Sequence, residues 1–203
     1  MTAKQPKEVR LRQILDAAVA VFLENGYERA SMEKIAARSG LTKGGLYHHF
    51  KGKDDILLEA TRRFAEPVTE IMGKTASRTS AEKALRGLIR QYLGYWDSHR
   101  TELAFYFLSM VKAVRLPHLA KLYEGYGLQV VAFYRGIFEN GFRSGEFRRH
   151  DAEVRATALA SALDGAAGIL LVDPQSNLRS FTAALEQCFV DDILIKKKAG
   201  GRP

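Results

Sequence analysis

Residues 42–53 read TKGGLYHHFKGK, and this stretch determines how the rest of the chain is interpreted. Two adjacent glycines and two adjacent histidines stand here between segments with good helical periodicity. Each glycine costs about 1 kcal/mol of helix propensity relative to alanine, so the segment weakens its own helix. Because Gly44 and Gly45 carry no side chains, a partner can approach the backbone closely, and we expect that partner to lie outside the fold.

The residues around this stretch predict a helix-turn-helix. Ser31 is a favourable N-cap for a short helix ending near Ser39, and Thr42 is one for a second helix over residues 43–49. Gly40 between them can take the positive φ that reverses the chain. In this motif the second helix enters the major groove of DNA while the first crosses the backbone. The apolar residues expected to hold the two helices together are Ile35, Ala36, Leu41, Leu46 and Phe50.

The polar side chains of the second helix have the chemistry of DNA contacts. Lys43 and Lys53 begin successive helices and are expected to contact phosphates. Tyr47 can donate its hydroxyl to a phosphate. His48 lies about 100° around the helix from Tyr47 and is the candidate for reading a base edge.

The positive charge is concentrated at the two ends of the chain. The net charge is +8, with ten Lys or Arg against five Asp or Glu in residues 1–53. Residues 196–203 add four positive side chains and no acid, and we expect this tail to be disordered. Residues 54–195 hold 17 basic and 18 acidic side chains. A basic N-terminal module on a neutral body indicates a polyanionic partner, the alternative being a basic surface that serves solubility alone.

Apolar residues recur with helical spacing almost throughout, and strict alternation is absent. The sequence therefore predicts an all-α protein of about nine helices, punctuated by residues such as Gly141 and Gly145. The expected helices cover residues 8–24, 32–39, 43–49, 54–72, 80–98, 101–114, 117–142, 151–172 and 177–195, with Pro67 kinking or interrupting the fourth. The predicted domains are a DNA-binding domain over 1–53 and a ligand-binding and dimerisation bundle over 54–195, with 54–72 as connecting helix and 196–203 as tail.

The segment ILDAAVAVFLENGYERASMEKIAARSGLTKGGLYHHFKGKDDIL, residues 14–57, resembles the DNA-binding region of TetR/AcrR-type transcriptional regulators. Two positions depart from the family pattern: Gly45, where Thr, Ala or Ser is frequent, and Ala30-Ser31, where two threonines are frequent. Beyond residue 60 the resemblance concerns architecture alone. It implies a homodimer that binds DNA through the N-terminal domain and a small molecule through the C-terminal one. The DNA-contacting positions that it implies are Ser31, Thr42, Lys43, Gly44, Tyr47, His48 and Lys53.

The C-terminal bundle carries many aromatic residues at helical spacing. Most can be explained as helix core, but buried tyrosines need partners for their hydroxyls, and several converging on one bundle could orient an apolar ligand. Asp164 is a single acid in an apolar helix, and it could either anchor a ligand or make a cross-helix hydrogen bond. The residues predicted to bind a ligand are Tyr92, Trp96, Phe105, Leu108, Tyr123, Tyr126, Phe133 and Asp164.

The C-terminal helices are expected to form the dimer. Residues 151–172 are rich in Ala, Gly and Leu, and small side chains let helices approach closely. Together with residues 177–195 they are the candidate isologous four-helix interface. Such a dimer would place two recognition helices in successive major grooves, about 34 Å apart.

Other classes of protein are disfavoured. His48 and His49 point about 100° apart and have no second ligand at i+3 or i+4, so we expect no metal and no cofactor. Motifs of nucleophilic, phosphate-binding and zinc enzymes are absent. No apolar run reaches a membrane span, no signal peptide is evident, and Cys188 is the only cysteine, which favours the cytoplasm.

Together these features predict a ligand-responsive transcriptional regulator, most simply a repressor released from a palindromic operator by a mostly apolar or aromatic effector. The alternative is an architectural DNA binder, or a small-molecule-binding helical protein without a role in transcription.

Overall fold

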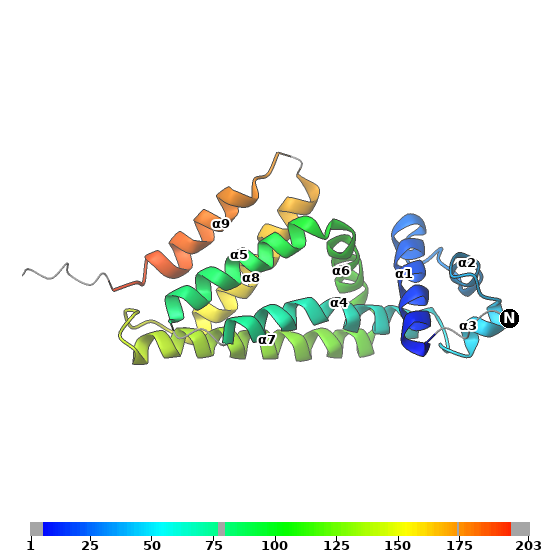
Figure 1. Ribbon diagram of the computed structural model, residues 1–203, viewed down its shortest axis with the longest axis horizontal. Coiled ribbons are helices and arrows are strands. Elements are labelled where there is room, and N and C mark those ends of the chain that lie inside the picture. The colour runs from blue at the N-terminus through cyan, green and yellow to red at the C-terminus, as the bar shows by residue number, and fades with distance from the viewer. Residues whose placement is uncertain (1–5, 77–79, 174, 196–203) are drawn as a thin grey trace, which may run out of the picture. The chain divides into compact units, whose positions relative to one another are not determined.

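The computed structural model describes residues 6–76, 80–173 and 175–195, and within these ranges it contains nine α-helices and no strand beyond one isolated bridge between Phe147 and Leu194 (Figure 1). The all-α prediction, with a helix-turn-helix near the N-terminus, is therefore confirmed. The helices are α1 (Lys7–Asn25), α2 (Met32–Arg38), α3 (Lys43–Tyr47), α4 (Lys53–Ala76), α5 (Ala81–Ser98), α6 (Arg100–Ala113), α7 (Pro117–Arg143), α8 (Ala152–Val172) and α9 (Leu178–Glu186), and a π-helix, η1 (Gln187–Asp191), follows α9.

The chain divides into two compact units. Unit 1 holds residues up to Glu66 together with Ala104–Leu122, and unit 2 holds Pro67–Leu103 and the residues from Tyr123 onward. The predicted functional boundary between residues 53 and 54 stays a prediction, and the tail over 196–203 lies outside the described residues.

Three helices differ from their predicted bounds by two or more residues at one end. α4 continues through Pro67 to Ala76 and is not interrupted, since a proline removes only one backbone donor from a helix of 24 residues. α3 ends at Tyr47, because the amide of His49 bonds back to Leu46 at 2.9 Å and tightens the turn. The helix predicted over 177–195 changes to the π-helix after Glu186, and this wider turn buries Val190 completely.

The core of unit 1 fixes the helix-turn-helix. α2 packs against both α1 and α3, and Ala36, which is 2% exposed, is small enough for a close crossing. Leu46 is fully buried, so one face of the short α3 is anchored while the opposite face stays free. The other buried residues of this core include Ile14, Phe22, Ile35, Phe50, Ile56 and Leu57.

In unit 2, α5 packs against α8 and α9, and these three helices lie side by side in Figure 1. An ionic network centred on Arg86 reinforces this packing. The Arg86 guanidinium donates to Glu82 at 3.0 Å, to Glu186 at 3.1 Å and also to Asp191, and Arg90 donates to Glu186 at 2.6 Å. The network therefore ties α5 to the end of α9 and to η1.

A carboxylate from the loop after α7 caps the start of α5. Glu146 accepts hydrogen bonds from the Ser80 hydroxyl at 2.7 Å, from the amides of Ala81 and Glu82 at 3.1 and 3.0 Å, and from the Ser144 hydroxyl at 3.1 Å. Burial alone would raise the pKa of Glu146, but these donors outweigh it and lower the pKa below its ordinary value. The interaction satisfies free amides at a helix N-terminus.

We expect Glu146→Gln to destabilise the protein by about 1 kcal/mol at neutral pH, because the charge-assisted hydrogen bonds weaken while solvent screening limits the loss. A lowered pKa means that this stabilisation is full above the unfolded pKa, near 4.5, and disappears as the pH falls through the folded pKa. Urea unfolding of both proteins at pH 7 and pH 3.5 checks the prediction. A difference that persisted unchanged at pH 3.5 would contradict it.

Among the described residues, α8 is the one helix that is long and apolar enough to cross a membrane, judged by length and composition only. The core helix of a soluble protein can meet the same criteria. α8 packs against α5 and α9, although only 33% of its apolar window is buried within the chain. The rest of this window is exposed or half-buried on the chain.

Candidate nucleic-acid interface

The two helices of the motif begin with the predicted caps. The Ser31 side chain accepts from the amide of Lys34 at 3.3 Å, and that of Thr42 accepts from the amide of Gly45 at 3.1 Å. Gly40 has a φ of 66°, the left-handed conformation that reverses the chain between the helices. Ser31 and Thr42 thus position the two helices, whatever contacts they make with DNA.

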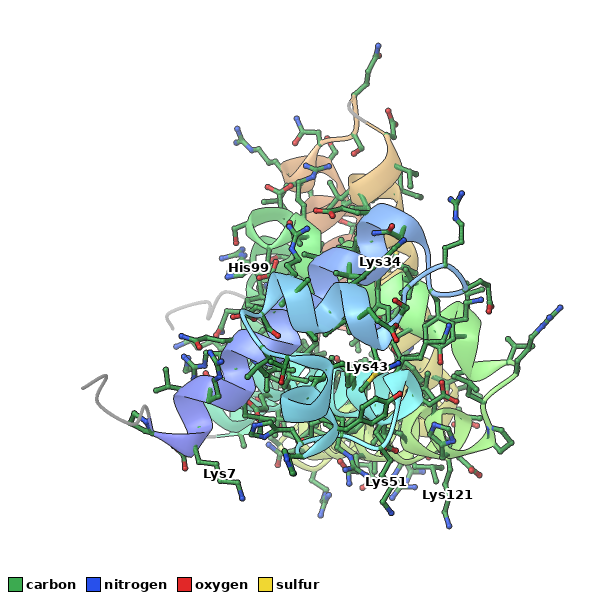
Figure 2. The ribbon with its side chains drawn as sticks, turned by 90° about the vertical axis from the view of Figure 1, so that its right-hand side faces the viewer. Lys7, Lys34, Lys43, Lys51, His99 and Lys121 are labelled. Carbon is green, nitrogen blue, oxygen red and sulfur yellow. The ribbon has the colours of Figure 1, made fainter. Side chains whose placement is uncertain are left out.

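The face of α3 opposite Leu46 is open. Lys43, Tyr47 and His48 are exposed, Tyr47 by 48%. A Cβ built at Gly44 would meet no described atom within 4 Å, so a flat partner can reach the helix backbone there. Figure 2 views this end of unit 1, with Lys34, Lys43 and Lys51 labelled around α2 and α3.

Lys43 pairs with a residue that was not among the predicted site residues. Its ammonium group pairs with the carboxylate of Glu33 in the first turn of α2. The hydrogen bond from Lys43, together with Glu33's own amide and the Ser31 hydroxyl, lowers the pKa of Glu33 to about 2. The pair is more than half exposed, so it orients Lys43 without adding much stability.

We expect Glu33→Gln to raise the affinity for non-specific DNA about tenfold near 0.1 M salt, because it frees one cation and removes one anion from the face predicted to meet phosphates. The slope of log affinity against log salt should steepen by about one. Fluorescence anisotropy with a random duplex at several salt concentrations measures both quantities. An affinity and a slope that both stay unchanged would contradict this prediction.

The ammonium group of Lys53 is bonded within the protein. It donates to the carbonyl oxygens of Tyr27 at 2.9 Å, Glu28 at 3.3 Å and Ala30 at 3.4 Å, and lies 4.4 Å from the centroid of the Tyr27 ring. Lys53 therefore joins the start of α4 to the loop between α1 and α2. Its predicted phosphate contact stays a prediction.

Lys53→Ala should lower thermal stability as well as weaken binding to all DNA sequences, because three carbonyls lose their donor. Differential scanning calorimetry and anisotropy on the same preparations separate the two effects. Lys51→Ala is the matched control, since Lys51 is exposed and, within the described ranges, its one hydrogen bond is from its backbone amide to Asp55 at 3.0 Å. Loss of DNA affinity in Lys53→Ala with no loss of stability would contradict the bracing role.

Unit 2 brings three of the predicted ligand residues together. The hydroxyl of Tyr92 donates to Asp164, and the Tyr92 and Trp96 rings lie edge to face with centroids 6.2 Å apart. Tyr134, which was not among the predicted site residues, lies close enough to feel the Asp164 charge. Burial, and then that charge, raise the pKa of Tyr134 above its ordinary value. Asp164 thus makes a cross-helix hydrogen bond, one of the two roles left open for it.

The other predicted ligand residues are distributed differently. Phe105 is fully buried in unit 1, 4.9 Å from Phe64 and 6.4 Å from Phe22 between ring centroids, so it belongs to that unit's core. Leu108 also lies in unit 1 and lines a groove. Tyr123, Tyr126 and Phe133 are half-buried along α7. For all of them the ligand-binding role stays a prediction.

Sequence reasoning missed the residues whose roles depend on long-range pairing. Glu33, Tyr134 and Lys112 carry no local motif, and only the fold brings them to their partners Lys43, Asp164 and Glu28. Across the described residues no group of three His, Cys, Asp or Glu side chains could hold a metal ion.

Comparison with known proteins supports this interpretation of the interface. Residues 14–60 match the model of the family described as bacterial regulatory proteins, tetR family. The chain is 29% identical over 153 residues to the fatty acid metabolism regulator protein of Bacillus subtilis, covering 73% of this chain and 74% of that protein. It is 27% identical to the transcriptional repressor KstR2 of Rhodococcus jostii, with 70% of each chain covered.

Solved structures share the fold. A transcriptional regulator from Saccharomonospora viridis in complex with choline superposes with a TM-score of 0.82 at 23% identity, covering 94% of this chain and 100% of that one. The fatty acid degradation regulator FadR of Bacillus halodurans gives 0.74 at 21% identity, covering 92% and 96%. At such identities these similarities concern the fold alone.

Proposed function

This chain belongs to the TetR family of transcriptional regulators, not to an enzyme family, and on that basis we propose that it is a cytoplasmic repressor that binds a palindromic operator as a homodimer and is released by a small molecule. The observation that carries the proposal is the open face of α3, where Gly44 leaves the backbone accessible between the exposed Lys43, Tyr47 and His48. In this proposal Lys43 and Tyr47 contact phosphates and His48 reads a base edge. Repression is supported by relatives such as KstR2, which is named a repressor.

A homodimer through α8 and α9 is supported by the exposed surface of α8. One stripe of this helix, at spacings of three and four residues, is exposed and consists of small or apolar side chains. Its members are Val154, Ala158, Ser161, Gly165, Ile169 and Val172. Val172 is 76% exposed and Val154 62%, so a second copy covering this stripe would remove apolar surface from water. Cys188 in η1, which follows α9, is also exposed.

The effector is a mostly apolar or aromatic molecule. Support comes from the cluster of Tyr92, Trp96, Tyr134 and Asp164 in unit 2, which combines aromatic surface with one carboxylate. The names of two comparison proteins point to candidate classes of effector. One protein is named for fatty acid metabolism, and the other was solved in complex with choline. An acyl compound uses the apolar surface, and a cationic one also uses Asp164.

Release from DNA would follow from a change in the separation of the two recognition helices. α4 runs without a break from Lys53, beside α3 in the chain, to Ala76 in unit 2, so it can carry a displacement between the units. The effector needs to prefer the non-binding arrangement by only about 1–3 kcal/mol.

Binding to an inverted repeat near the protein's own gene tests the operator proposal. We expect two chains per site in sedimentation experiments and a steep salt dependence in anisotropy. Ala158→Arg places a charge within the α8 stripe and should give a monomer with weak operator binding. Gln129→Arg, an exposed position on α7, is the control. A wild-type chain that is monomeric at micromolar concentration and still binds the repeat would refute the dimer.

Native mass spectrometry of the purified protein identifies a co-purified effector. Operator affinity is then measured with and without that compound. An affinity that does not change while the compound is bound tightly would refute release by an effector, and equal affinity for operator and random DNA would favour an architectural DNA binder.

A further inference from the structure

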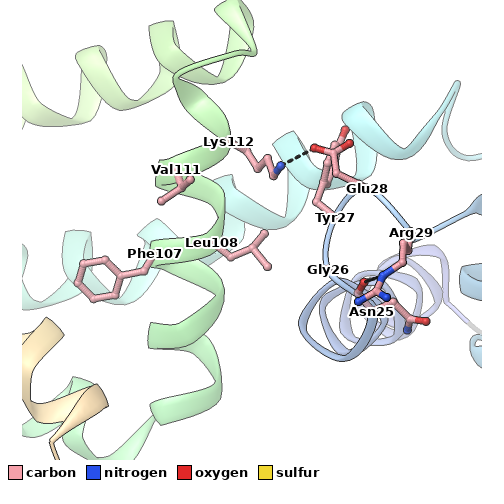
Figure 3. A pocket seen from close by; sticks show the side chains of 9 residues that line it. All are labelled: Asn25, Gly26, Tyr27, Glu28, Arg29, Phe107, Leu108, Val111 and Lys112. Carbon is pink, nitrogen blue, oxygen red and sulfur yellow. Dashed lines mark hydrogen bonds and ion pairs between the residues drawn. The ribbon is translucent and has the colours of Figure 1, made fainter.

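Unit 1 contains a groove of about 570 Å³ between the loop that follows α1 and the last turns of α6 (Figure 3). Only Leu108 is shared with the predicted ligand residues, and the groove is separate from the exposed face of α3. Its volume is in the range of small-molecule sites. The residues lining it are Asn25, Gly26, Tyr27, Glu28, Arg29, Phe107, Leu108, Val111 and Lys112.

The wall formed by α6 is apolar. Leu108 points from α6 toward the loop in Figure 3, whereas Phe107 and Val111, which also line the groove, extend from the other side of α6. Val111 is 67% exposed, so the unit leaves this part of the wall in contact with water. A hydrocarbon chain lying in the groove would remove that surface from water, which is favourable in proportion to the area covered.

One end of the groove carries two charged side chains, Lys112 and Glu28, and they differ in how exposed they are. Lys112 extends toward the loop, pairs with the carboxylate of Glu28, and lies 5.3 Å from the centroid of the Tyr27 ring. The Lys112 side chain is 23% exposed, whereas that of Glu28 is 72% exposed. A well-solvated carboxylate gains little from such a pair, so another carboxylate can replace it at small cost.

The surroundings of Glu28 favour negative charge. The hydrogen bond from Lys112 and its charge lower the pKa of Glu28, and the charges of Lys53 and Arg115 lower it further. Arg29 adds another cation to the lining. Lys112, Lys53 and Arg115 thus act on Glu28, while a second carboxylate, that of Asp54, accepts a hydrogen bond from the Tyr27 hydroxyl at the groove. A ligand carboxylate on Lys112 would enter the potential of these cations in place of Glu28.

We propose that this groove binds an amphipathic carboxylate, an acyl chain of medium length that covers Leu108 and Val111 and places its carboxylate on Lys112 in place of Glu28. This site lies in the DNA-binding unit and does not depend on the effector site proposed for unit 2. When the ligand binds, the contact between Lys112 on α6 and Glu28 in the loop before α2 is lost, and a contact between Lys112 and the ligand replaces it.

Decanoate titrated into the full chain, with methyl groups observed by NMR, tests the location of the site. The Leu108 and Val111 methyl signals should shift at lower decanoate concentration than those of Leu88 and Leu163 in unit 2. Decanamide, which has a neutral head group on the same chain, should bind the groove about tenfold more weakly, because it loses a charge-assisted hydrogen bond.

Four variants test the exchange of carboxylates. Glu28→Gln should tighten decanoate binding about tenfold by releasing Lys112, whereas Lys112→Gln should weaken it about tenfold and abolish the preference over decanamide. Leu108→Glu places a protein carboxylate one turn before Lys112 at i,i+4 and should block the site. Val114→Glu adds the same charge at an 85% exposed position outside the groove and should leave binding unchanged. Thermal melts confirm that each variant is folded.

Two results would overturn the proposal. One is decanoate shifting the unit 2 methyl signals while those of Leu108 and Val111 stay fixed, which would leave the proposed effector site intact. The other is an unchanged decanoate affinity in both Glu28→Gln and Lys112→Gln. A third result would separate the two proposals. If the decanoate affinity of the groove changed as expected in the variants, while no ligand changed the operator affinity, this site would be supported and release by an effector would be refuted.

Discussion

Gly141→Ala is expected to destabilise unit 2 by about 3 kcal/mol. A Cβ at this position in α7 would lie 2.0 Å from a ring carbon of Phe147, 2.5 Å from a second and 2.8 Å from a third. Phe147 is 2% exposed and its ring also approaches that of Phe138, with centroids 6.4 Å apart. The ring cannot move without losing its burial or straining the segment that pairs with Leu194. Urea unfolding measures the loss.

Gly136→Ala is the matched control on the same helix. A Cβ at Gly136 meets no described atom within 4 Å, so this change should raise stability by up to about 1 kcal/mol through helix propensity. Combining Gly141→Ala with Phe147→Leu should restore part of the loss, because the smaller side chain relieves the overlap. Equal effects of the two glycine substitutions would show that the contact with Phe147 does not constrain Gly141.

Gly44→Leu is expected to lower operator affinity at least 100-fold, the loss of more than 2.7 kcal/mol of binding free energy. The new side chain would project from the exposed face of α3 and hold the duplex away from the backbone, so several phosphate and base contacts would lengthen together. The folded chain should tolerate the change, since nothing among the described residues lies within 4 Å of the Cβ position. Thermal stability should stay constant or rise, because leucine favours a helix more than glycine does. Anisotropy and calorimetry on one preparation measure both quantities.

Gly136→Leu controls for the substitution itself and should leave DNA affinity unchanged. Gly44→Ala should fall between the wild type and Gly44→Leu. If Gly44→Leu bound the operator as tightly as the wild type, α3 would not be the surface that meets DNA.

Local signals predicted the helix-turn-helix well, because its determinants are close in sequence. The caps at Ser31 and Thr42 act three residues away, and Gly40 acts on its own backbone. Such interactions depend on residue type and spacing alone. The same reasoning was less accurate at helix ends. It extended the third helix past Tyr47 and the last helix past Glu186, where a tight turn and a π-turn are stabilised by burial of Phe50 and Val190.

Two glycines illustrate the difference between a local role and a role that depends on tertiary packing. The sequence indicated Gly141 and Gly145 alike as helix punctuation. Gly145 has a φ of 71° and does lie where the chain reverses, whereas α7 continues past Gly141 to Arg143. Gly141 is required because a ring six residues later folds back against it. No pattern in the sequence distinguishes these two roles.

The sequence by itself predicted the all-helical class and the helix-turn-helix with its glycine-rich second helix, because caps, turns and helical periodicity act over a few residues. Only the tertiary structure decided what each charged or aromatic side chain does. In the folded chain Lys43 forms an ion pair with Glu33, and Lys53 donates to three carbonyl oxygens. Phe105 is buried in the core of unit 1. The reason is physical: electrostatic and packing energies depend on distances between residues far apart in the chain, and those distances exist only once the helices have packed.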